Sequence, residues 1–464
     1  MVAISVCLLL SFSQLGWRAG TPEPVLEEDK DFVKLYWKAW ENYHAHVVEE
    51  VRLGMFPPKF SASGESFEFQ DGLGHALFAK WAWRATPCAE SVKFALQLVR
   101  DDGNAVERVL LSDGSRHGLT NCLPLSSLAV WSVYKFSGDK TFLSHCLPAL
   151  SKRNSLYWVN FQNEEGILRI PPEMSFLPPQ PIMKSDSADA LAVLLIDTDF
   201  LSRVAKSAGV NQAHRAYDRQ KIDLWKRMNA IYHQETGVFS GRDEGDAPVE
   251  LLSLLPLWVG ICEDAPKDKM SKFFDTLTSR TGFSSMFPYP LLSKSHPQYK
   301  GDSGVKPLHN YLVLKSLMSS GKRTMAGYAA ESMMRNLLRN AGGDDILWSE
   351  YGPDTRTPAD HAKRNSVDAG YIAIAGLIEA ILGFDVSAEK NTITWDIWRA
   401  DRHGIKNLRY ANNAVSLICE RRESRSSQAV IEIECQKPFT LRVLISGKEY
   451  VKRFREGKHV WEVG

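Results

Sequence analysis

Apolar residues recur at three- and four-residue spacing, or almost without interruption, along most of the chain between about residues 29 and 383. This periodicity is typical of helices with one or more buried faces. It predicts twelve helices, with the approximate spans 29–50, 71–84, 88–102, 123–136, 139–162, 186–208, 211–233, 249–261, 266–280, 306–319, 322–340 and 367–382.

The links between these predicted helices alternate between short and long. The short links carry helix stop and start residues, such as Ser-Gly-Asp at 137–139, because Gly suits the end of one helix and Asp the N-cap of the next. Long loops in compact domains are usually functional, and alternate links of an up-and-down arrangement lie at the same end. We therefore expect six functional loops to meet at one end. They span 51–70, 103–122, 163–185, 234–248, 281–305 and 341–366.

Alternate helices also differ in polarity. The predicted helices 123–136, 249–261 and 367–382 are apolar nearly throughout, whereas 211–233 is amphipathic and charged. Buried inner helices and outer helices with one wet face explain this contrast. The pattern predicts a mainly α fold, a closed ring of six helical hairpins called an (α/α)6 toroid, over residues 29–385. An irregular helical bundle or an open solenoid is the alternative.

After residue 385 the chain changes to short β-branched and aromatic runs with partial alternation. They predict a small C-terminal antiparallel β-domain over 386–464. Two of these runs, AVSLICE and AVIEIEC, would form a hairpin with a charged turn between them. If that turn centres near Ser427, Cys419 and Cys435 face each other within bridging range, which predicts a disulfide. Two free buried thiols are the alternative.

Composition narrows the function. The net charge of +1 argues against a protein that binds nucleic-acid phosphates. The apolar run 2–17 has the length of a secretory signal peptide, so we expect a signal over 1–20 and an exported protein, with a retained anchor as the alternative. No CxxC or metal-ligand spacing occurs, so we expect no metal and no cofactor. The 13 Trp and 14 Tyr suit a sugar ligand but also fill cores.

One carboxylate is prominent in the last long loop, which contains LWSEYGPDTRTP. Glu350 lies there between Trp348 and Tyr351, at the end where the six loops are expected to meet. A solvated loop carboxylate is the bland interpretation. The functional one is the base of a glycoside hydrolase, with the two aromatic residues as sugar contacts.

Such an enzyme needs a second carboxylate, the general acid, on a loop across the ring. The loop 169–189 offers Glu173, which lies among prolines and aromatics that would raise its pKa. It also offers Asp186, which falls at a predicted helix start and could instead stabilise that helix end. Asp71 could bind sugar hydroxyls or cap a helix.

The chain resembles the six-hairpin glycosidases, in particular the bacterial branch of glycoside hydrolase family 63 with its mannosylglycerate hydrolases, and more distantly the trehalases. SEYGPDTRTP followed by SVDAGYIAIAGLIEAILGF is similar to the family's loop and small-residue helix, and the resemblance implies that Glu350 is the catalytic base. PLHNYLVLKSL (307–317) resembles another family helix, and we expect its His309 and Asn310 to bind substrate.

Three departures limit the resemblance. The family's Trp-Asp is Gln70-Asp71 here, and its W-R-G-P-V-W-P stretch is KGDSGVKP (300–307). The family's E-S-G-x-D-N segment, whose Asp is the acid, is PEMSFLPP, with Glu173 in register with the Glu and no Asp. The resemblance therefore does not assign the acid.

The sequence predicts an exported glycoside hydrolase that inverts configuration and takes a small glycoside or oligosaccharide, with no nucleic-acid partner and no membrane contact beyond a possible signal anchor. A polysaccharide lyase or sugar epimerase on the same toroid is the first alternative, since the loops also contain His117, His296 and His361. A degenerate, carbohydrate-binding toroid is the second.

Overall fold

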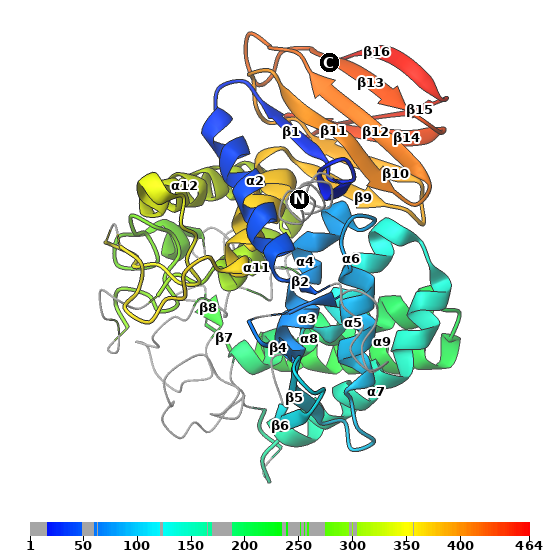
Figure 1. Cartoon of the computed structure of the whole chain (residues 1–464), viewed down its shortest axis with the longest axis vertical. Helices are drawn as coiled ribbons and strands as arrows, with labels where there is room; N and C mark the ends of the chain where they lie inside the picture. The colour runs from blue at the N-terminus through cyan, green and yellow to red at the C-terminus, as the bar shows by residue number, and fades with distance from the viewer. Residues whose placement is uncertain are drawn as a thin grey trace, which may run out of the picture.

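The computed structural model describes residues 16–48, 60–62, 64–120, 124–164, 166–168, 188–233, 238–239, 274–296, 299, 304–355 and 357–464, together with Leu251, Leu255 and Trp258. The loop with Glu173 and Asp186 lies outside these residues. The chain forms a mainly helical body with a separate β-domain packed on one end of it (Figure 1).

Where the structure describes it, the helical body follows the predicted spans, whereas most of the predicted helices 249–261 and 266–280 lies outside the described residues. Its helices are α2 (Lys30–Ala45), α3 (Phe69–Gly74), α4 (Ala76–Ala79), η1 (Lys80–Ala82), α5 (Cys88–Gln97), α6 (Ser126–Ser137), α7 (Lys140–Phe161), α8 (Ala188–Ser207), α9 (Asn211–Ala230), α11 (Pro307–Ser319), α12 (Arg323–Ala341), η4 (Gly342–Asp344), η5 (Val367–Ala369) and the π-type helix η6 (Tyr371–Ile381). The predicted turn at 137–139 is confirmed, because Gly138 ends α6 with φ 68° and the Asp139 side chain accepts from Thr141 N at 2.9 Å.

The contrast between apolar and amphipathic helices is confirmed in the burial of their side chains. Every residue of η6 is buried, and so are most residues of α11, whereas α9 buries only Leu224 and Met228. Helix α6 packs on α4 and α8, and η6 packs on α4 and α11, so these buried helices lie side by side. The charged outer helices α7, α9 and α12 each pack against a buried partner.

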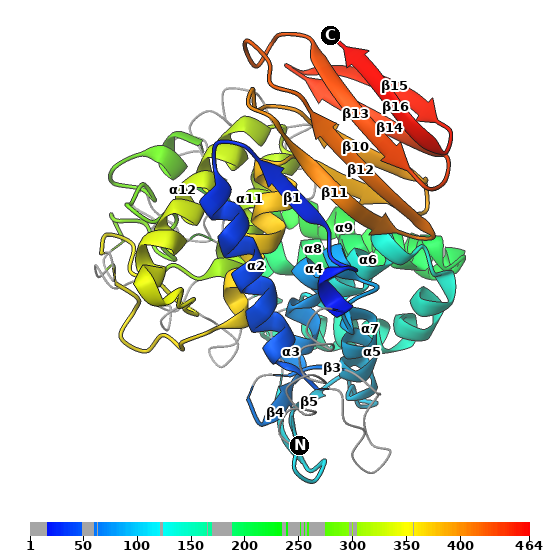
Figure 2. The same ribbon diagram turned by 45° about the horizontal axis from the view of Figure 1, so that its top comes forward.

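The two ends of the buried helices face different surroundings. Helix α11 begins at Pro307, next to Lys306 in the Glu350 region. The carboxyl ends of α6 and η6 face the β-domain. Ala388 N donates to Lys135 O of α6 at 2.7 Å, and Trp395 Nε1 of the β-domain donates to Leu382 O at the end of η6 at 2.8 Å. The loop with Glu350 and the β-domain thus lie at opposite ends of the buried helices, as Figure 2 also shows.

The β-domain consists of two sheets. The first has the order β1 (Glu23–Leu26), β11 (His403–Tyr410), β12 (Asn413–Cys419), β13 (Ala429–Cys435) and β16 (Gly457–Val463). The second has the order β15 (Lys448–Phe454), β14 (Phe439–Ile445), β10 (Thr392–Asp396) and β9 (Phe384–Ser387). Strict alternation of buried and exposed residues along β13 fits the predicted period of two.

Two features of this domain correct the sequence-based expectation. The domain is not purely antiparallel, because β10 pairs with β14 in parallel, with Thr392 opposite Thr440. Strand β1, from the N-terminal part of the chain, completes the first sheet by pairing with β11. A parallel pair needs a long connection between its two strands. Here the connection from β10 to β14 contains the strands β11, β12 and β13 of the first sheet.

The predicted disulfide is wrong, because Cys419 and Cys435 are free thiols. In the β12–β13 ladder Cys419 lies opposite Ile431, and Cys435 lies opposite Val415. The turn therefore centres two residues earlier than expected. Although both thiols are buried in the domain, they are four residues apart along the ladder, which is about 13 Å at the rise of a strand.

The predicted loop 103–122 also contains structure. Strands β5 (Ala105–Leu110) and β6 (Arg116–Thr120) form a hairpin, and β4 (Ser66–Glu68) pairs with β5. Short strand pairs are also formed by β2 (Val47–Val48) with β3 (Phe60–Ser61) and by β7 (Tyr232–His233) with β8 (Val238–Phe239). Within the described part of the chain, no helix has the length and apolarity needed to cross a membrane.

One buried arginine joins the two parts. The Arg399 guanidinium contacts Asp401 at 2.8 Å, Asp29 before α2 at 2.7 Å, and Glu331 of α12 at 2.5 Å. Its donors are thereby shared between the β-domain and two helices of the body. This cluster fixes how the β-domain packs on the helices.

Candidate functional site

The loop that contains Glu350 runs as an extended segment between two other parts of the chain. On one side, Tyr351 N donates to Val305 O at 3.1 Å, and Val305 N donates to Tyr351 O at 2.7 Å. On the other side, Ser349 N donates to Lys363 O at 3.0 Å. Backbone hydrogen bonds on both sides hold the glutamate in place, although the loop has no regular secondary structure.

The Glu350 carboxylate is nearly buried, with 7% of the residue exposed. Its Oε2 lies 3.0 Å from Nε2 of His361 and 4.0 Å from Nζ of Lys306. A Cβ built on Gly304 would lie 1.5 Å from Oε1, so the carboxylate packs directly against the backbone there. Three separate segments of the chain therefore position this one carboxylate.

The two aromatic neighbours of Glu350 have different environments. Tyr351 is fully buried, and its hydroxyl accepts from Trp348 N at 2.9 Å. Burial raises the pKa of Tyr351 well beyond its usual range. The ring thus supports the turn from inside. Trp348 is only partly buried, and the Arg364 guanidinium lies 5.6 Å from the centre of its ring.

The predicted substrate residues of α11 lie below this loop. Asn310 is fully buried: its side chain accepts from Tyr289 N at 2.6 Å and donates to Tyr289 O at 3.0 Å, so it fixes the backbone of that residue. His309 is also buried, and burial, with the Lys306 cation nearby, lowers the pKa of His309 to about 3. Its imidazole is neutral at physiological pH, and contact with substrate stays a prediction for both residues.

A second group of carboxylates lies at the same end. Asp368, which follows the Glu350 loop, accepts from Ser366 Oγ at 3.1 Å. Burial, and then the Asp71 carboxylate, raise the pKa of Asp368. Asp368 also raises the pKa of the buried Tyr351. The predicted Asp71 lies in the first turn of α3, where its carbonyl oxygen accepts from His75 N at 2.9 Å.

The general acid stays a prediction, because Glu173 and Asp186 both lie outside the described residues. Among the residues that the structure describes, no cluster of three or more His, Cys, Asp or Glu could hold a metal ion. The site as described is a carboxylate site.

Sequence reasoning did not identify Gly304, Lys306, His361 or Asp368 as parts of this site. The segment KGDSGVKP is notable in the sequence only because it departs from the family pattern. In the structure, its Gly304 and Lys306 both lie beside the Glu350 carboxylate. His361 is, from the sequence, one of several loop histidines that suit an alternative chemistry. The missing signal for Gly304 and Lys306 was the backbone pairing of Val305 with Tyr351, which brings their segment to Glu350.

Comparison with models of known protein families finds no match for this chain. An uncharacterised protein of Borreliella burgdorferi is 23% identical over 345 residues, which is 69% of this chain and 72% of that protein. This relative therefore does not indicate an activity for the chain.

Solved structures give a clearer likeness. A sialidase matches 92% of this chain with a TM-score of 0.67 at 12% identity. A native α-L-rhamnosidase from Aspergillus terreus matches 96% of this chain with a TM-score of 0.61 at 14% identity. The chain spans 40% of that sialidase and 50% of that rhamnosidase. A family 63 mannosylglycerate hydrolase from Thermus thermophilus, in complex with glucose, matches 74% of this chain and 99% of its own length, with a TM-score of 0.56 at 13% identity. The predicted resemblance to glycosidases with helical toroid folds is confirmed at the level of the fold.

Proposed function

We propose that this protein is a glycoside hydrolase that inverts anomeric configuration, with Glu350 as its general base. The fold it shares with glycosidases supports the reaction class. The observation that carries the proposal is the Glu350 carboxylate, which is nearly buried and held between Gly304, Lys306 and His361. A solvated loop glutamate would need no such support.

In the proposed reaction, Glu350 accepts a proton from a water molecule as the water oxygen bonds to the anomeric carbon. The bond from that carbon to the glycosidic oxygen breaks, and the general acid donates a proton to this oxygen. Inversion needs the two carboxyl groups about 6.5–9.5 Å apart, with the water between them. Lys306 and His361 lie beside Oε2 and the Gly304 backbone packs against Oε1, so the carboxylate would accept the proton from one fixed orientation.

The remaining parts of the proposal concern segments outside the described residues. Glu173 is proposed as the acid, with Asp186 as the competing residue. The buried helices are proposed to close into an (α/α)6 ring through the segment around Trp258, which packs against Phe200 of α8 with ring centres 5.8 Å apart. Asp71, Trp348 and His309 are proposed to contact a small carbohydrate, and the chain is proposed to be exported.

The test compares Glu350→Gln with Asp360→Asn. Asp360 lies in the same loop and is exposed, so its variant removes the same charge without touching the site. The probes are mannosylglycerate and aryl α- and β-glycosides of mannose, glucose and rhamnose. Loss of a catalytic base should lower kcat by about 10³-fold or more in Glu350→Gln, with Asp360→Asn close to wild type. Proton NMR of the first product then reports the anomer.

Other outcomes separate the competing functions. An unsaturated product would indicate a lyase, and a stereoisomer formed without bond cleavage would indicate an epimerase. Binding of the sugars without turnover by the wild-type chain would indicate a degenerate toroid. Activity that survives in Glu350→Gln would show that the base is elsewhere.

A further inference from the structure

A polar cavity of about 190 Å³ lies at the other end of the buried helices, where they face the β-domain. Lys315 and Ser319 of α11 line it, whereas Glu350 lies beside the start of that helix at Pro307. Eight residues of helix separate Pro307 from Lys315, which is about 12 Å at the rise of an α-helix. The cavity is therefore distinct from the Glu350 site, and the inference drawn from it does not depend on the proposed glycosidase activity.

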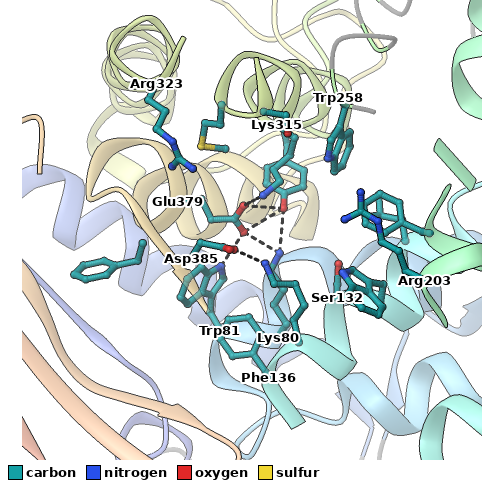
Figure 3. Close-up of a pocket in the computed structure, with 18 residues that line it drawn as sticks. Lys80, Trp81, Ser132, Phe136, Arg203, Trp258, Lys315, Arg323, Glu379 and Asp385 are labelled. Carbon is teal, nitrogen blue, oxygen red and sulfur yellow. Dashed lines mark hydrogen bonds and ion pairs between the residues drawn. The ribbon is translucent and has the colours of Figure 1, made fainter. Parts of the chain in front are cut away.

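The centre of the cavity wall is a buried ionic network around Glu379 of η6 (Figure 3). Lys80 Nζ lies 2.8 Å from Oε1, and Lys315 Nζ lies 2.7 Å from Oε2. The Tyr311 hydroxyl and the Trp81 indole N–H, which donates at 3.0 Å, also contact the carboxylate. Burial alone would raise the pKa of Glu379, but Lys315 and Lys80 lower it to about 2. This carboxylate is fully ionised and its acceptor positions are occupied.

The cations outnumber the carboxylates at this wall. Lys80 and Lys315 share the single charge of Glu379, while Lys135 is matched one to one by Asp385. Burial, and the cations Lys315 and Lys135, lower the pKa of Lys80 to about 8 although Glu379 opposes the change. The buried wall of the cavity therefore carries more positive than negative charge. A bound anion would balance this excess and so be stabilised there.

Another cation, Arg203, reaches the cavity from α8. Arg203 pairs with Asp199 at 2.6 Å, but Asp199 is also bound by Lys221 of α9 at 3.0 Å. Arg203 lines the cavity, whereas Lys221 is not among its lining residues. Lys221 also lies 3.7 Å from Asp218, so Arg203 is the cation of this group that faces the cavity.

The ends of the helices offset part of this charge. The carboxyl ends of α6 and α11 point to the same region, and each helix end carries about half a negative charge that acts over its last turn. Full cationic groups from four helices exceed these partial charges. The remaining walls include the aromatic rings of Trp131 and Trp258, which suit the face of a small ring.

We propose that this cavity is a binding site for a small anion with one phosphate or carboxylate group, held by Arg203, Lys135 and Lys315. The guanidinium of Arg203 suits such a group because its donors match two oxygens at once. The aromatic walls would contact the body of the ligand. The Glu350 site and this site would then take different ligands.

The test is isothermal titration calorimetry of the full chain with inorganic phosphate, glucose 6-phosphate, glucuronate and glucose, at constant ionic strength set by chloride. Arg203→Gln should weaken the binding of the preferred anion about tenfold or more, because it removes a charged hydrogen-bond donor. Lys221→Gln is the matched control: it takes a cation from the same Asp199 but does not line the cavity, so binding should change by no more than about twofold.

Several results decide the proposal and the source of the anion. Glucose 6-phosphate binding more tightly than glucuronate identifies a phosphate ligand, and the reverse order identifies a carboxylate. Lys135→Gln provides a second cavity variant if Arg203→Gln does not fold, as judged by its melting temperature. No anion binding, equal loss in Lys221→Gln, or binding abolished by Glu350→Gln would each overturn the proposal. The last result would place the anion at the Glu350 site, whereas failure of glycosidase activity would leave this proposal intact.

Discussion

Replacement of Gly304 by alanine tests whether the position of the Glu350 carboxylate matters. The added methyl group would lie 1.5 Å from Oε1, 2.3 Å from Cδ and 2.6 Å from Cγ of Glu350. Carbon and oxygen atoms in ordinary contact are about 3.5 Å apart. The methyl and the carboxylate cannot both keep their present positions.

The size of the displacement follows from these distances. Oε1 must move by about 2 Å, or the backbone must shift by a similar amount, to restore an ordinary contact. Misplacement of a catalytic group by about 1 Å can cost about 10²-fold in rate. We therefore expect kcat to fall by about 10²-fold or more in Gly304→Ala. Gly304 does not have a left-handed backbone, so alanine adds no conformational strain of its own there.

Stability should respond much less than activity. A Gly→Ala change at a compatible backbone stabilises by about 0.4–1 kcal/mol through the unfolded chain, and the new contact offsets this gain. The matched control is Gly343→Ala, because no atom lies within 4 Å of the position that its new methyl group would take, and its backbone is not left-handed either. The assay is kcat on the best glycoside found for the wild type, with the melting temperature measured for each variant.

The outcome separates two explanations. If Gly304→Ala loses activity while Gly343→Ala does not, and both melt near wild type, the carboxylate must be held where the structure places it. If Gly304→Ala keeps wild-type kcat while Glu350→Gln is inactive, the carboxylate works from another position. That result would refute the argument that the Gly304 backbone positions the base.

Three further predictions concern other parts of the chain. His361→Ala should lower kcat several-fold, by the loss of about 1 kcal/mol from one hydrogen bond to Glu350, with little change in melting temperature because the imidazole is 73% exposed. Burial raises the pKa of Asp197 to about 6 from 3.8, so its contribution to stability is present below about pH 4 and is lost as pH rises through 6. In urea unfolding, the free energy of unfolding of Asp197→Asn relative to wild type should rise by up to about 3 kcal/mol between pH 4 and pH 7. Arg399→Met should cost about 3–5 kcal/mol, since it leaves buried carboxylates unpaired, while Arg402→Met, which removes a half-exposed pair with Glu420, should cost under about 1 kcal/mol.

The helices were predictable because their signals are local. The spacing of apolar residues within one helix decides which face is buried, and Gly138 and Asp139 mark a helix end and a helix start without reference to the rest of the chain. The difference in polarity between α9 and η6 likewise follows from each segment's own composition. These properties can be predicted from the sequence because they depend only on residues a few positions apart.

The errors in the β-domain have a common physical cause, which is that strand pairing depends on distant segments. Both β12 and β13 were expected, but a turn centre displaced by two residues moves Cys419 from Cys435 to Ile431. The parallel pairing of β10 with β14 joins residues about 50 positions apart, and the pairing of β1 with β11 joins residues almost 400 positions apart. No local pattern specifies which of several similar strands will be neighbours.

The candidate site also has one part that could be predicted from local sequence and one part that could not. The sequence singled out Glu350 because an isolated carboxylate between two aromatics in a turn is unusual locally. Its supporting contacts could not be predicted, because Gly304 and Lys306 reach it across a backbone pairing 46 residues away in sequence, and His361 reaches it across the loop's own hairpin. The length of the loop is explained by these contacts. A short turn could expose a glutamate, but it could not fold back to place a histidine on one oxygen while the preceding segment packs against the other. A carboxylate that must accept a proton at one fixed position needs that support, and the long loop provides it.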